Sequence, residues 1–163
     1  MTSRIIQAFA FALLSIVATG QAFAEASENH AITVAHPWAR ATPPIEPVNA
    51  AAYMIINNQS DKDIRVTGVS TPIAQTASLH QSLTVDGQMR MRALPDGLAV
   101  PAGGSVKLEP KGYHVMMMSL DEPLKVGDSF PVTLTFADSE SAGASIVVDV
   151  QVRDERPASH SSH

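Results

Sequence analysis

Short stretches in which apolar and polar residues alternate follow one another along most of the chain. The clearest runs from Ser129 to Phe136, where Phe130, Val132 and Leu134 fall on the same face as Phe136. Turns rich in Pro, Gly and Asn separate it from similar stretches at residues 32–40, 50–57, 64–69, 76–85, 88–94, 98–100, 105–108, 113–120 and 146–152. A period of two is typical of strands. Short strands at this regular spacing, separated by such turns, predict an all-β domain, either a sandwich or a barrel.

Both ends of the chain differ from this pattern. Arg4 precedes an apolar run, Ala8 to Ala18, that is too short to span a membrane, and Ala22-Phe23-Ala24 fits a small-x-small cleavage site. We therefore expect a cleaved signal peptide over residues 1–24, a β-sandwich domain over 25–152, and a disordered polar tail over 153–163. Such a protein would be exported, most simply to a bacterial periplasm.

Composition narrows the possible functions. Without Arg4 the mature chain has 10 Lys and Arg (11 − 1) against 16 Asp and Glu, a net charge of −6, which disfavours nucleic acid and stable membrane association. The chain has no cysteine, so a blue-copper electron-transfer site is excluded because it needs a thiolate. There is no nucleophile motif, no His-Glu-x-x-His and no paired acidic site, and we do not expect an enzyme.

Methionine is concentrated in one part of the chain. Five of the seven methionines lie between His80 and Met118. Asp86-Gly87 is a strong signal for a two-residue hairpin turn. This turn would pair Ser82 with Met91 and His80 with Ala93, which puts His80 and Met91 on one face as diagonal neighbours.

The next methionine-rich strand has the same periodicity. Between Tyr113 and Leu120 a period of two places His114, Met116 and Met118 on one face, with Val115 and Met117 on the other. Two imidazoles and two thioethers could then converge, from His80, Met91, His114 and Met116. Neutral thioether ligands favour Cu(I), whereas structural zinc sites use Cys, His and carboxylate. Met89 and Met118 share these faces, and the pattern leaves open whether they ligate.

Two methionines and the single tryptophan have a simpler interpretation. Methionine commonly fills gaps in cores, and we expect this of Met54 and Met117. Trp38 is expected to pack in the core as well. His36, just before a proline, is expected to be structural.

The same residues resemble a known family signature. His80, ten residues, Met91 and then His114-Val115-Met116 is similar to the pattern of the PCuAC-type periplasmic copper chaperones. The resemblance covers roughly residues 32 to 152, and one departure is visible: 22 residues separate Met91 from His114, one more than is usual in the family. Flanking stretches agree also, namely Trp38-Ala39-Arg40-Ala41-Thr42-Pro43-Pro44, Ala50-Ala51-Ala52-Tyr53, Met89-Arg90-Met91-Arg92, Pro101-Ala102-Gly103-Gly104 and Gly112-Tyr113-His114.

The resemblance implies a cupredoxin-like Greek-key β-sandwich that binds Cu(I) and passes it to a copper-accepting protein. The implied destination is the CuA centre of cytochrome c oxidase, directly or alongside a thiol-bearing assembly factor, and we expect a monomer. The alternative is an exported β-sandwich interaction module that binds no metal. The tail histidines His160 and His163 are expected to be solvated, with a weak secondary Cu(II) site as the other possibility.

Overall fold

The computed structural model describes residues 31–137 and 145–154. The predicted signal peptide and the tail histidines lie outside these residues. Within them every regular element is a strand, ten in all, which confirms the all-β prediction. The described part contains no helix that is long and apolar enough to cross a bilayer. The strands are β1 (Ile32–Arg40), β2 (Ala50–Asn58), β3 (Ile64–Ser70), β4 (Ala74–Val85), β5 (Gln88–Ala93), β6 (Leu98–Val100), β7 (Ser105–Leu108), β8 (Tyr113–Leu120), β9 (Ser129–Ala137) and β10 (Ser145–Arg153).

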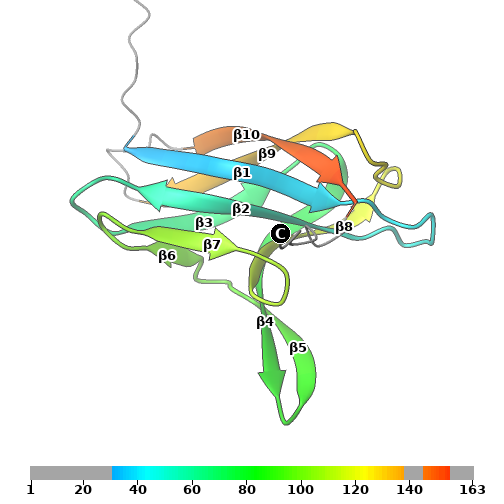
Figure 1. The fold of residues 1–163 in the computed structure, drawn as a ribbon, viewed down its shortest axis with the longest axis horizontal. Coiled ribbons are helices and arrows are strands. Elements are labelled where there is room, and N and C mark those ends of the chain that lie inside the picture. The colour runs from blue at the N-terminus through cyan, green and yellow to red at the C-terminus, as the bar shows by residue number, and fades with distance from the viewer. Residues whose placement is uncertain (1–30, 138–144, 155–163) are drawn as a thin grey trace, which may run out of the picture.

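The strands are joined in the order β5-β4-β8-β7-β2-β1-β10-β9-β3-β6, with an additional pairing of β8 to β2. Only β1–β10 and β7–β8 are parallel. Figure 1 shows the strands gathered into a layered body from which the β4–β5 hairpin projects. Strands inside this order supply most of the core, which includes Ile56 of β2, Val115 of β8, Leu134 of β9 and Val150 of β10, all fully buried.

The core confirms the expectation for two methionines and corrects the one for tryptophan. Met54 and Met117 are both fully buried. Trp38 is only half-buried and stacks on Tyr53, with ring centroids 4.6 Å apart. The cause is a bulge between Ala35 and Trp38, where His36 has a φ of 50°. The bulge changes the alternation of β1 and turns the tryptophan out of the core.

The β4–β5 hairpin has the predicted register. Val85 pairs with Gln88, Ser82 with Met91, and His80 with Ala93. Asp86 and Gly87 have φ values of 52° and 76°, as the two-residue type I′ turn requires. The far half of the hairpin extends beyond the core, so every residue of β5 is exposed.

Candidate metal site at the base of the hairpin

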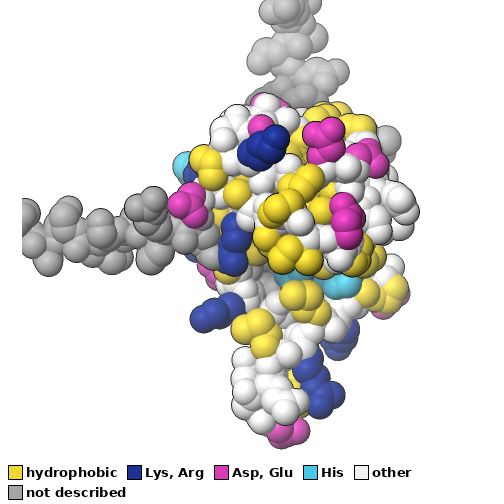
Figure 2. Space-filling model, turned by 90° about the vertical axis from the view of Figure 1, so that its right-hand side faces the viewer, with side chains coloured by type: hydrophobic (Ala, Val, Ile, Leu, Met, Phe, Trp, Pro, Cys, Tyr) yellow, Lys and Arg dark blue, Asp and Glu magenta, His cyan; other side chains and the backbone are white. Residues whose placement is uncertain are grey.

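Two histidines lie side by side where the hairpin leaves the body. His80 of β4 is directly opposite His114 of β8, and their ring centroids are 5.9 Å apart. Opposite residues in an antiparallel pair share one face of the sheet. Figure 2 shows histidine side chains at this junction, bordered by hydrophobic side chains above and below. The predicted convergence of the two imidazoles is therefore present.

Each imidazole is held through one ring nitrogen. His114 Nδ1 lies 3.1 Å from the carbonyl oxygen of Gly112, and His80 Nε2 lies 3.0 Å from Ser78 Oγ. A carbonyl only accepts, so Nδ1 of His114 carries the proton and Nε2 has the lone pair. When His80 likewise donates from Nε2 to Ser78, its lone pair is on Nδ1.

The other two ring nitrogens are buried and have no partner. They are His80 Nδ1 and His114 Nε2. Buried polar atoms are nearly always hydrogen-bonded, so two such atoms on neighbouring rings require an explanation. A metal-bound histidine has this arrangement, because its second nitrogen donates to an oxygen that orients the ring.

The electrostatic environment favours the neutral form of His80. Burial lowers the pKa of His80 below its ordinary value of 6.5, and the nearby His114 lowers it further. Desolvation disfavours the charged imidazolium, and a second positive ring would repel it. Neutral imidazole is the form that binds metals.

The predicted thioether residues lie on the same face, one on each side of His80. Met91 of β5 is opposite Ser82, and Met116 of β8 is opposite Ser78, so both are diagonal neighbours of His80. The extra residue between Met91 and His114 has not moved the ligand side chains to the other face of the sheet, because His80 and His114 are still paired. Met91 is 60% exposed and Met116 is half-buried.

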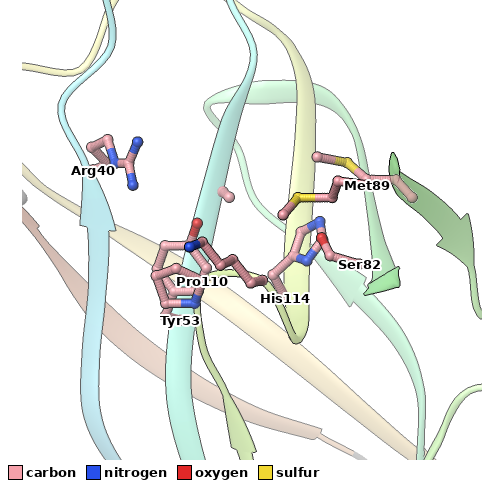
Figure 3. A pocket seen from close by; sticks show the side chains of 9 residues that line it. Arg40, Tyr53, Ser82, Met89, Pro110 and His114 are labelled. Carbon is pink, nitrogen blue, oxygen red and sulfur yellow. The ribbon is translucent and has the colours of Figure 1, made fainter. Parts of the chain in front are cut away.

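A hollow of about 570 Å³ opens beside the two histidines. In Figure 3, Met89, Ser82 and His114 lie on one side of it and Arg40 on the other. His80 and Met116 do not line the hollow, although they share the face of the sheet that borders it. The lining consists of Arg40, Ala51, Tyr53, Ser82, Met89, Met91, Pro110, Lys111 and His114.

Met89 lies beside His114 at the edge of the hollow, and the sequence left open whether it ligates. Met89 is 54% exposed and lines the hollow together with Met91. Met118 is 37% exposed on the same face, opposite Thr76 and farther from His80. The described residues contain no group of three or more His, Cys, Asp or Glu that could hold a metal. The side chains that lie with the two imidazoles on this face include thioethers, which favour a soft ion.

Comparison with known proteins agrees with this architecture. Residues 32–152 match the family described as "Putative lipoprotein LpqE-like". A protein of Leifsonia xyli subsp. xyli (strain CTCB07), "Putative lipoprotein Lxx21020", is 32% identical over 98 residues, which are 60% of this chain and 59% of that protein. The matched part is thus less than two thirds of that relative's length.

Solved structures give a more extensive match. The copper-bound PCuAC domain from PmoF2 is 26% identical, with a TM-score of 0.57 over 76% of this chain and 92% of that one. The solution structure of CuI-DR1885 from Deinococcus radiodurans is 33% identical, with a TM-score of 0.55 over 81% and 86% of the two chains. The fold is accordingly the expected cupredoxin-like β-sandwich, and the chain belongs to the LpqE-like, PCuAC-type family.

Proposed function

We propose that this chain is an exported copper chaperone that binds one Cu(I) at the base of the hairpin. The proposed ligands are His80 through Nδ1, His114 through Nε2, and the thioethers of Met91 and Met116, with Met89, which lines the same hollow, as the alternative thioether. The observation that carries the proposal is the pair of buried, partnerless imidazole nitrogens on neighbouring rings. The similarity to the copper-bound PCuAC domain from PmoF2 and to CuI-DR1885 supports it.

A carrier must release its ion as well as hold it. The histidines are fixed by Ser78 and Gly112, whereas Met91 and Met89 are more than half exposed on a projecting hairpin. An incoming ligand can therefore displace a thioether without disturbing the imidazoles. This division between fixed and exposed ligands suits stepwise transfer to a second protein.

The family resemblance favours the CuA centre of cytochrome c oxidase as the destination, directly or through a thiol-bearing assembly factor. The lipoprotein relatives support an exported location, which we propose is the periplasm. We propose that residues 1–24 are a cleaved signal peptide.

An anaerobic titration against a Cu(I) chelator tests the proposal. We expect one tightly held Cu(I) per chain and weaker binding of Cu(II). A chain that takes up no Cu(I) under these conditions would instead be the interaction module without a metal.

Acid should weaken Cu(I) binding. Because the pKa of His80 lies below 6.5, neutral imidazole persists under mildly acidic conditions, and the affinity should fall only as the pH is lowered further. Thioethers do not titrate, so some binding should remain. The experiment is the chelator titration repeated from neutral pH to about pH 4. An affinity that is constant over this range would contradict ligation by histidine.

The lowered pKa of His80 also affects the stability of the copper-free protein, and this stability must be measured in parallel. The unfolded chain has the ordinary histidine pKa, so between the folded pKa and 6.5 it binds more protons than the folded chain. The contribution of His80 to stability is therefore greatest above about pH 6.5 and is lost as the pH falls through the folded pKa.

Ser78→Ala should lower Cu(I) affinity by about tenfold or more, because it removes the hydroxyl that orients His80. Ser105→Ala is the matched control, since Ser105 is exposed on β7 and away from the site. Both variants are compared with the parent by chelator titration. Equal affinities for all three proteins would mean that the hydroxyl does not position the ligand.

A further inference from the structure

The strand that carries Met89 and Met91 is at an open edge of the sheet. β5 is the first strand in the order, paired only with β4, and all six of its residues are exposed. Figure 1 shows it at the outside of the projecting hairpin. In the described part of the chain no strand covers its outer side. An open edge presents unpaired backbone groups that can pair with another chain.

The hydrogen-bond phase determines which backbone groups are available. Leu94 donates its N–H to Leu79 O at 2.9 Å, so this pair is bonded across β4 and β5. Bonded and non-bonded pairs alternate in an antiparallel ladder. Arg92 and Arg90 therefore direct their N–H and C=O groups toward β4, whereas Ala93, Met91 and Met89 direct theirs to the open side.

The two faces of β5 have different chemistry. Met89 and Met91 are on the face of His80, while Arg90 and Arg92 are on the opposite face, opposite Leu83 and Gln81. Both arginines are exposed and are the only charged residues of the strand. The whole chain has a net charge of −5, so this positive edge contrasts with the rest of the molecule.

We propose, on the basis of the copper-carrier function above, that the copper acceptor docks by adding an antiparallel extended segment to the edge of β5. That segment would alternate acidic residues, which face Arg90 and Arg92, with soft donors, which face Met89 and Met91. Main-chain bonds provide affinity in strand addition, and alternate side chains provide specificity. Charge complementarity identifies the partner as acidic.

Strand addition would bring the acceptor ligand to the copper. Side chains directly opposite on paired strands have Cβ atoms about 5 Å apart, so a donor opposite Met91 reaches the same ion. Copper stays as Cu(I) throughout: its bond to one thioether breaks as the bond to the incoming sulfur forms. If the donor is a cysteine, its thiol proton passes to water.

Two other occupants fit the edge less well. A second copy of this chain paired through β5 would bring arginines against arginines. A lipid surface could attract the arginines and the exposed methionines, but it offers no backbone to pair with Met89, Met91 and Ala93.

The probe is the peptide acetyl-Asp-Met-Asp-Cys-Asp-Met-Asp-amide, mixed anaerobically with the Cu(I)-loaded chain. Copper passed to the peptide is measured against time after separation by size. The scrambled peptide acetyl-Asp-Asp-Met-Met-Asp-Asp-Cys-amide has the same composition but no separation of faces, and should take copper about tenfold more slowly. With the copper-free chain, the alternating peptide should slow hydrogen exchange at the amides of Met89, Met91 and Ala93.

Methylation of peptide nitrogens gives a matched pair of controls. In this register the Met and Cys residues of the peptide would direct their N–H groups at β5. Methylation of those nitrogens should therefore abolish the faster copper uptake of the alternating peptide relative to the scrambled one. Methylation of the aspartate nitrogens should leave it unchanged. Equal rates of copper transfer to the two methylated peptides would contradict docking by strand addition.

Variants of the chain test the same edge. Ala93→Pro removes one N–H group on the open side of β5 without removing a bond to β4. The double variant Arg90→Glu/Arg92→Glu reverses the charge of the edge. Each should slow copper transfer to the peptide about tenfold while the Cu(I) affinity of the chain stays unchanged. Lys125→Glu, an exposed charge after β8, is the control and should have no effect. Three results would overturn this inference alone. They are an unchanged rate of copper transfer in these variants, self-association through β5 in sedimentation, and binding to anionic phospholipid vesicles in place of the peptide. Failure of the parent chain to hold Cu(I) would overturn the proposed function as well.

Discussion

His114→Phe is expected to lower Cu(I) affinity by about 100-fold or more, the largest effect of any single substitution in this chain. The variant keeps a flat ring in a site where the parent side chain is only 3% exposed, but it removes the partnerless Nε2. It also removes the contact between Nδ1 and Gly112 O. Affinity is measured by anaerobic chelator titration, and thermal unfolding of the copper-free protein monitors the fold.

The matched control for this substitution is His36→Asn. His36 is exposed on β1, and asparagine tolerates its positive φ of 50°. This variant should bind Cu(I) as the parent does. If His114→Phe folded and retained the parent affinity, His114 would not be a ligand and the proposed ligand set would be wrong.

The methionine substitutions separate ligands from core residues. Met91→Leu and Met116→Leu should each weaken Cu(I) binding by about tenfold or more, because a thioether is replaced by a group that cannot ligate. Leucine is close to methionine in volume, so the free energy of unfolding of the copper-free protein should change by less than ~1.5 kcal/mol. Met117→Leu changes a fully buried side chain on the opposite face, and its Cu(I) affinity should be unchanged.

Met89→Leu and Met118→Leu should have smaller effects than Met91→Leu and Met116→Leu. Met89 lines the hollow beside His114, so its effect should exceed that of Met118, which lies farther along β8. All five variants can be compared in one background by calorimetry and chelator titration. A loss of affinity in Met117→Leu equal to that in Met116→Leu would invalidate the face assignment for β8.

Much of the fold could be predicted from local patterns. The bounds Leu98–Val100 and Tyr113–Leu120 were predicted as observed, because alternation ends at turn residues on both sides. The hairpin register followed from Asp86-Gly87 alone, since a two-residue turn leaves one pairing. These features depend on residues that are close in sequence.

Features that depend on distant residues could not be predicted in the same way. Alternation placed His80 and His114 on faces of their strands, but only the packing of β4 against β8 makes them direct neighbours. The roles of Ser78 and Gly112 follow from ring orientation, which no sequence pattern specifies. Trp38 was wrongly assigned to the core because the bulge in β1 changes the phase of the strand.

The most direct test of the copper site is X-ray absorption at the copper edge of the anaerobically loaded protein. We expect Cu(I) with both nitrogen and sulfur neighbours, from two imidazoles and at least one thioether, and loss of sulfur scattering when Met91 and Met116 are both leucine. A spectrum of the parent protein with nitrogen and oxygen neighbours only would contradict this expectation.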